Sequence, residues 1–276
     1  LGPIGTTVLP DGNILTVDVA NGDNYVFKDQ DNQAFSAALP LFTTPGMGCC
    51  GAYATSNGWA WGGQNGLLTR FNNDGTIAQT YNIGVSNGVW TNPVNGNLLI
   101  ANGDIKNVDV SDINNPTLVS EFGSQADGLV VSPDGQLVYT SYIVGFDIQT
   151  GVQVFNHFVN GGDGMGIIIS NNSLNGKLIA NTNLGTVLLI DPTGVDPDVI
   201  IADQGARGDY TTPDPTDGSL ILTQGADLWR LSCGQGCGIS VAPPATNVPE
   251  PASLALMGAS LGVMAASRRR RAAAKV

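Results

Sequence analysis

The chain has 276 residues, of which 37 are glycine, and its formal net charge is −12. Residues 1–247 carry 22 acidic and 6 basic side chains, and a part this acidic would repel phosphate backbones, which argues against nucleic-acid binding. Because 21 of the 23 acidic residues are Asp, an acid typical of turns, the excess indicates turn chemistry first and cation binding second.

One unit recurs between residues 5 and 240: a Gly opens a short strand, a turn ends in Gly, and further strands follow. The turn glycines, 38 to 46 residues apart, are Gly12, Gly58, Gly96, Gly135, Gly176 and Gly218. Second strands are predicted at residues 13–18, 59–63, 97–103, 136–141, 177–182 and 219–224. Third strands are predicted at residues 24–29, 67–74, 106–112, 143–151, 186–194 and 227–232. Weaker fourth strands complete several units, for example at residues 152–158 and 238–244.

A four-stranded sheet of this size cannot bury both faces alone, so the copies must stack. Radial closure leaves only short edges exposed, and six units therefore predict an all-β, six-bladed β-propeller of four-stranded antiparallel blades over residues 1–240. A linear β-solenoid is the alternative, although its repeats are usually shorter.

The repeat also resembles a known group of propellers. ADGLVVSPDGQLVYTS at 126–141 and FDIQTG at 146–151 are similar to blades of the YVTN, NHL and SMP-30-like propellers. That group includes binding scaffolds and metal-dependent lactonases, so the resemblance implies the fold and leaves the function open between these two classes.

The C-terminal residues have a different composition. Residues 241–247 form a Pro-containing linker, and the segment after it, residues 248–276, opens with Val248, Pro249, Glu250 and Pro251. Residues 252–267 are uncharged, and the cluster that follows them is Arg268, Arg269, Arg270 and Arg271. A helix of this length spans about 24 Å, and snorkelling arginines extend it toward a membrane crossing. The basic cluster would stay cytoplasmic, which puts the propeller outside.

This order of VPEP, apolar helix and Arg cluster resembles the PEP-CTERM sorting signal. The resemblance implies an exported protein that its C-terminal transmembrane helix holds in the inner membrane until an exosortase processes it, and that then reaches the cell surface or the medium. A simple C-terminal tail anchor is the alternative. The chain starts at Leu1, and either removal of a signal peptide or a fragment accounts for this start.

Four residues are candidate cation ligands. Asn87, Asp127 and Asp163 each precede a Gly that opens a predicted innermost strand, and Asp209 follows Gly208. Inner strands of a propeller start near one axis, so these oxygens could converge on Ca²⁺ at the channel mouth. The alternative is that they only stabilise loops, with Arg207 neutralising Asp209.

The resemblance to lactonases implies a Glu, an Asn and an Asp around the metal. Glu121 is the only glutamate among residues 1–240, and it does not precede a predicted innermost strand. This departure argues against lactonase activity.

Structural roles are predicted for most of the other reactive residues. Cys233 and Cys237 flank a short loop and are predicted to form a disulfide, whereas the pairing of Cys49 and Cys50 stays open. The spacing supports no zinc site. His157 is predicted to be a packed or surface residue. The tryptophans suit either blade packing or sugar stacking; they are Trp59, Trp61, Trp90 and Trp229.

Two functional hypotheses follow. The first is a non-enzymatic exported propeller that binds or organises surface material, either exopolysaccharide or a partner protein. The second is a metal-dependent hydrolase of the lactonase type. Convergence of three or more oxygen ligands at the channel mouth would favour the second.

Overall fold

The computed structural model describes residues 3–28, 40–45, 52–64, 67–84, 88–124, 128–141, 143–170, 172–214 and 218–231. These residues form six antiparallel sheets, and each sheet takes its strands from one continuous stretch of the chain. Five sheets have four strands and the sixth has three. The predicted all-β, six-bladed propeller is therefore confirmed.

The first three blades follow one another along the chain. Blade 1 contains β1 (Pro3–Val8), β2 (Ile14–Asp18), β3 (Asn24–Phe27) and β4 (Phe42–Thr44). Blade 2 contains β5 (Ala52–Ser56), β6 (Trp59–Gln64), β7 (Leu67–Phe71) and β8 (Ile77–Tyr81). Blade 3 contains β9 (Gly88–Thr91), β10 (Leu98–Ala101), β11 (Ile105–Asp109) and β12 (Thr117–Phe122).

The remaining blades repeat this order. Blade 4 contains β13 (Leu129–Val131), β14 (Leu137–Thr140), β15 (Val144–Asp147) and β16 (Gln153–Asn156). Blade 5 contains β17 (Gly162–Ile167), β18 (Leu178–Thr182), β19 (Val187–Ile190) and β20 (Val199–Ala202). Blade 6 contains β21 (Gly208–Pro213), β22 (Leu220–Gln224) and β23 (Asp227–Leu231). The fourth strand predicted for this blade, at residues 238–244, lies outside the described residues.

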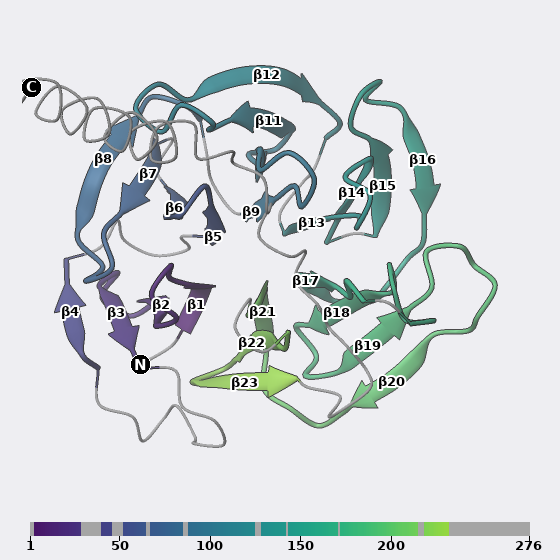
Figure 1. Ribbon diagram of the computed structural model, residues 1–276. Helices are drawn as coiled ribbons and strands as arrows, with labels where there is room; N and C mark the ends of the chain where they lie inside the picture. Colours follow the sequence, from purple (N-terminus) through teal and green to yellow (C-terminus); the bar gives the residue numbers. More distant parts are fainter. Residues whose placement is uncertain are drawn as a thin grey trace, which may run out of the picture. The chain divides into compact units, whose positions relative to one another are not determined.

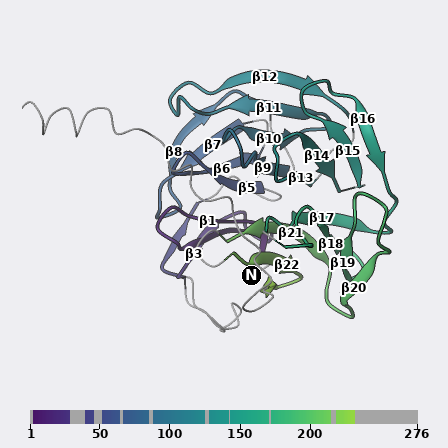
Figure 2. The same cartoon turned by 45° about the vertical axis from the view of Figure 1, so that its right-hand side comes forward.

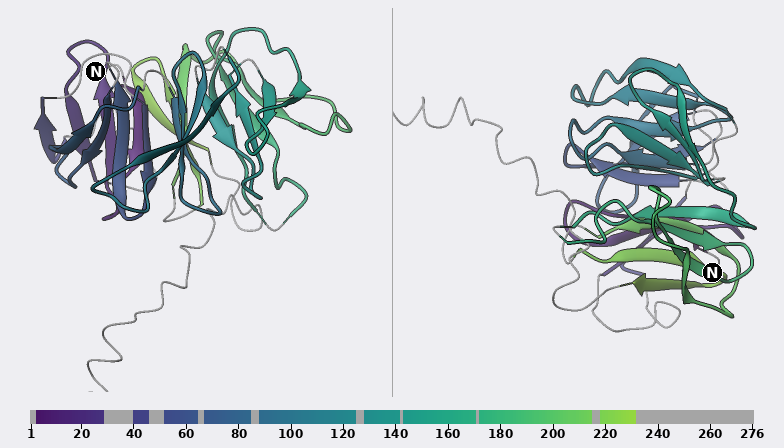
Figure 3. Two further views of the ribbon diagram at one scale, coloured as in Figure 1. Left: turned by 90° about the horizontal axis from the view of Figure 1, so that it is seen from above. Right: turned by 90° about the vertical axis from the view of Figure 1, so that its right-hand side faces the viewer.

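The first strands of the six blades surround the centre of the ring (Figure 1). Each of them contacts the first strand of the next blade, and β1 of blade 1 also contacts β21 of blade 6. This last contact closes the ring. Figures 2 and 3 show the blades from other sides, with the strands running along the axis of the ring and the turns on its two faces.

The six repeat glycines occupy equivalent places. Each lies in the turn between the first and second strands of its blade, with φ between 72° and 86°. A residue with a Cβ rarely adopts this left-handed conformation, so glycine at these positions permits the tight turn. The architectural prediction of six equivalent turns is therefore confirmed.

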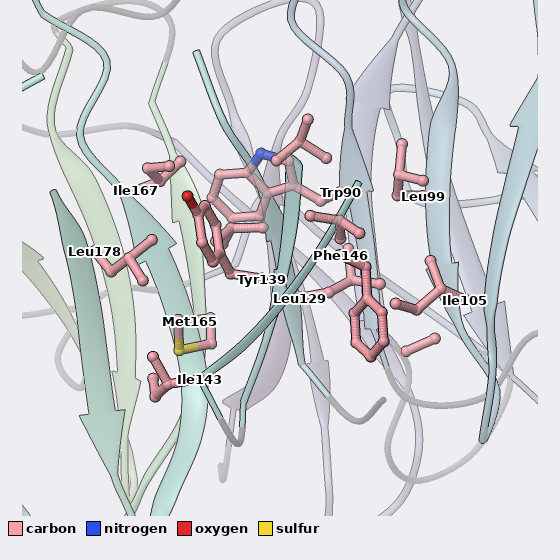
Figure 4. Packing of buried hydrophobic residues seen from close by; sticks show 14 of the residues in the cluster. Trp90, Leu99, Ile105, Leu129, Tyr139, Ile143, Phe146, Met165, Ile167 and Leu178 are labelled. Atoms are coloured by element: carbon pink, nitrogen blue, oxygen red, sulfur yellow. The ribbon is translucent and has the colours of Figure 1, made fainter. Parts of the chain in front are cut away.

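Apolar side chains from facing blades fill the space between them. A large cluster joins blades 3, 4 and 5, with Trp90, Leu129, Tyr139 and Met165 among its members (Figure 4). Val, Ile and Leu recur in five of the six second strands, the exception being β6 (WAWGGQ), and all residues of β10 and β18 are buried. Burial of these faces at about 25 cal/mol per Å² supplies the main driving force for stacking the blades.

The chain divides into two compact units, Leu1–Ala242 and Pro243–Val276. The described residues all belong to the first unit. Among them, no helix is long and apolar enough to cross a membrane. The predicted transmembrane helix at 252–267 lies outside the described residues and stays a prediction.

Candidate functional site

Two of the four predicted cation ligands lie side by side at the channel mouth. Asp163 belongs to β17 of blade 5 and Asp209 to β21 of blade 6, and these two innermost strands are in contact. Both side chains are largely covered, with 13% and 21% of their surface exposed. Asn87 and Asp127 lie outside the described residues, so convergence of all four on a cation stays a prediction.

A guanidinium group links the two carboxylates. Nη2 of Arg207 is 3.3 Å from Oδ2 of Asp163 and 3.1 Å from Oδ1 of Asp209. The Nε–H of Arg207 donates to Oδ1 of Asn183, which follows β18 in blade 5, at 2.7 Å. Three side chains from two blades are thus held by one positive charge, and a charge-assisted network of this kind is stronger than neutral hydrogen bonds.

The innermost strands approach closely because glycines open them. A Cβ added to Gly164 would lie 2.9 Å from the carbonyl carbon and oxygen of Asp209, and one added to Gly128 would lie 2.7 Å from the carbonyl oxygen of Asp163. Backbone cannot move aside as a side-chain tip can. The Asp-Gly pairs that suggested a ligand site therefore also have a packing role, in which the glycine lets neighbouring blades meet at the axis.

Tyr210 fills the middle of the ring. Tyr210 belongs to β21, and its hydroxyl donates across the centre of the propeller. The hydroxyl oxygen lies 2.7 Å from the carbonyl oxygen of Val89 in blade 3 and 3.0 Å from that of Tyr53 in blade 2. The residue is 6% exposed, and burial raises the pKa of its phenol far above the usual range, so it remains protonated and a donor. Sequence reasoning missed this residue, whose only signal was an aromatic ring on an innermost strand.

The described residues fit a divalent cation poorly. Ca²⁺ takes six to eight oxygens at about 2.3–2.6 Å, whereas Asp163 and Asp209 both face the positive charge of Arg207. Within the described ranges, no group of three or more His, Cys, Asp or Glu could hold a metal ion. A cation binding to this carboxylate pair would first have to displace Arg207.

Glu121 lies on the outer edge of its blade, whereas the channel mouth is lined by innermost strands. It belongs to β12, the outermost strand of blade 3. A hydrogen bond with Asp104 and repulsion from that carboxylate raise the pKa of Glu121. The expectation that this Glu does not precede an innermost strand is confirmed.

Many of the remaining acids stabilise turns, as the composition suggested. Oδ1 of Asp11, Asp134 and Asp147 accepts hydrogen bonds from backbone N–H groups two or three residues later, at 2.7 to 3.1 Å. In each case the carboxylate holds the turn that a short hairpin needs.

His157 follows β16, and its Nε2 lies 2.8 Å from Oδ2 of Asp198. Its ring stacks on Phe155 with centroids 6.3 Å apart, and its side chain is 39% exposed, so it is a surface residue as expected. Cys49, Cys50, Cys233 and Cys237 lie outside the described residues, and the Cys233–Cys237 disulfide stays a prediction.

Trp61 and Trp90 are buried between blades, and Trp59 packs under the guanidinium of Arg70. Trp229 is 44% exposed. Blade packing therefore accounts for the first three.

The C-terminal residues match a known family model. Residues 247–271 match the PEP-CTERM protein-sorting motif. The chain carries this sorting signal. The PEP-CTERM signal indicates an exported protein that is anchored at the membrane before processing, and it implies processing by an exosortase.

The propeller is similar to solved structures. A gluconolactonase from Xanthomonas campestris superposes with a TM-score of 0.61 at 16% identity, covering 83% of this chain and 85% of that one. At this identity the likeness shows the fold, which many functions share. No curated protein matches the chain.

Proposed function

We propose that this exported propeller binds or organises material at the cell surface and does not catalyse a reaction. The PEP-CTERM signal supports a surface destination, where exopolysaccharide or a surface protein is the available partner. A closed ring of blades is a scaffold that positions loops on its two faces, and loops held by such a scaffold are well suited to recognition.

The proposal rests on the ion pairs that Arg207 forms with Asp163 and Asp209. A lactonase of the metal-dependent type needs a divalent cation at the channel mouth, and here a resident guanidinium contacts both described carboxylates. An internal ion pair neutralises the negative potential that would otherwise attract the metal. Arg207 therefore supports a structural role for Asp163 and Asp209, in which they join blade 5 to blade 6.

The alternative is a metal-dependent lactonase, and hydrolysis of glucono-δ-lactone separates the two. We expect the purified protein to leave the uncatalysed rate unchanged in EDTA and in Ca²⁺ or Zn²⁺ alike. Circular dichroism on the same sample verifies that the propeller is folded. Turnover that depends on the metal, and that the paired substitutions Asp163→Asn and Asp209→Asn abolish, would establish the lactonase instead.

A further inference from the structure

A groove lies between blades 4 and 5, away from the channel mouth. It has a volume of about 390 Å³, within the range of ligand pockets. Its walls come from the turn between β13 and β14, the turn between β17 and β18, and the residues that follow β19. Asp163 lies near the start of β17, whereas these turns follow the ends of β13 and β17, so the groove is a separate site.

Tyr139 supplies a donor to this groove. Its residue surface is only 5% exposed, and its ring packs edge-on against Phe155 with centroids 5.9 Å apart. Burial, together with the Asp134 carboxylate of the same groove, raises the pKa of Tyr139, so its hydroxyl stays protonated. No described residue accepts a hydrogen bond from it. Its hydroxyl oxygen is not among the buried, unpartnered atoms of the described residues, so it reaches solvent in the groove and is free to donate to a ligand there.

A fixed ion pair forms the opposite wall. Nζ of Lys177 lies 2.9 Å from Oδ2 of Asp191 and 2.7 Å from Oδ2 of Asp196. Asp191 also accepts hydrogen bonds from Thr193 and from the backbone of Asp196. The ammonium group still has a third N–H to donate, whereas the capacity of Asp191 to accept is largely used.

Acceptors and apolar surface complete the groove. Oδ1 of Asp134 takes hydrogen bonds from Ser132 at 2.5 Å and from the backbone of Gln136 at 3.1 Å, and its carboxylate is exposed. Pro133, Leu137 and Pro192 add apolar contact. The carboxylates of the groove would repel an anionic ligand, and the ammonium group of Lys177 would repel a cationic one. A neutral hydroxyl group is repelled by neither, and it can both donate and accept hydrogen bonds.

We propose that the groove between blades 4 and 5 binds one residue of a neutral sugar. Hydroxyls of the sugar accept from Tyr139 and Lys177 and donate to Asp134, while its C–H face packs on Leu137 and Pro192. The inference rests on the proposed role as a binding propeller and adds the site and the ligand class.

Nuclear magnetic resonance titration of the ¹⁵N-labelled protein with glucose, galactose and mannose tests this proposal. Sugar concentrations up to about 50 mM suit the millimolar affinity of a single unit. We expect amide shifts to concentrate at residues 132–137, 173–177 and 191–193. Tyr139→Phe keeps the ring packing and removes one hydrogen bond, so affinity should fall about five-fold with an unchanged melting temperature.

Tyr25→Phe serves as the matched control, because that hydroxyl lies in blade 1 next to Asn21, and its affinity should equal that of the wild type. The proposal is overturned if none of the three sugars shifts these amides, if Tyr139→Phe binds as the wild type does, or if ethylammonium shifts them more strongly than the sugars. The lactone assay is independent, so the groove can fail while the non-enzymatic role stands.

Discussion

At the scale of single residues, glycine sets how closely the blades meet. Gly164 and Gly166 both lie on β17, but a Cβ at Gly164 would press on the backbone of Asp209, whereas one at Gly166 would meet side-chain atoms of Leu220, Thr211 and Ile179 at 3.2 to 3.4 Å. Neither glycine has a positive φ, so the two positions differ in their surroundings rather than in backbone strain.

Gly164→Ala should therefore destabilise the propeller by about 1–3 kcal/mol, the usual cost of overpacking. Gly166→Ala should cost less, because a leucine methyl can rotate away and a backbone carbonyl cannot. Urea denaturation of both variants gives the comparison. Equal losses of free energy in the two variants would contradict the close backbone approach at the axis.

Asp191 predicts a pH dependence at the same scale. Its side chain is 4% exposed, and although burial alone would raise the pKa, Lys177 and the hydrogen bonds from Thr193 and Asp196 hold the pKa of Asp191 well below its usual range. A lowered folded-state pKa stabilises the protein above the unfolded value of about 3.9, and this stability is lost as the pH falls. Asp191→Asn should lower the free energy of unfolding at pH 7 and flatten its fall toward pH 3.

Glu121→Gln is the control with the opposite sign. The pKa of Glu121 is raised, because Asp104 shares a hydrogen bond with it and repels its charge. Ionisation of Glu121 therefore opposes folding at neutral pH. Glu121→Gln replaces the carboxylate by an uncharged amide and should slightly raise the free energy of unfolding at pH 7. Denaturant titrations from pH 3 to pH 7 test both variants, and an acid slope of Asp191→Asn equal to that of the wild type would contradict the role of the Lys177–Asp191 pair.

At the scale of elements, the inner strands of each blade were predictable and several outer ones were not. Turn glycines and runs of Val, Ile and Leu mark the second strands, because these strands are buried on both faces. Nearly all residues of the outermost strands β8 and β20 are exposed. Neither IAQTY in β8 nor the wholly apolar VIIA in β20 shows the apolar–polar alternation that marks a half-buried strand, which is why sequence reasoning did not find them.

The candidate site was predictable to a similar extent. Positions at the starts of inner strands predicted that Asp163 and Asp209 would come from neighbouring blades, and Arg207 was the expected competitor for Asp209. Asn183 was not expected, because it joins the network from the turn after β18. Tyr210 was not expected either, since its two carbonyl partners lie on blades 2 and 3, more than 100 residues away in sequence. Contacts between distant blades leave no local pattern.

At the scale of the whole molecule, the sorting signal makes a prediction about mass. Export in a host that has an exosortase should yield a mature protein that lacks the residues following the PEP motif, including the four arginines at 268–271. Intact mass spectrometry of the exported protein measures this directly. A surface protein that retains Val276 would contradict processing at the motif and would favour a simple tail anchor.

The central claim is that the positive charge at the channel mouth is the side chain of Arg207 and not a metal ion. The melting temperature of the wild type in about 5 mM Ca²⁺, compared with EDTA, tests it most directly, because a ligand bound to the folded state raises stability in proportion to occupancy. We predict no difference for the wild type and a Ca²⁺-dependent rise for Arg207→Gln, whose carboxylates have lost this partner. A rise in the wild type that disappears when Asp127 and Asp163 are both changed to Asn would contradict the account.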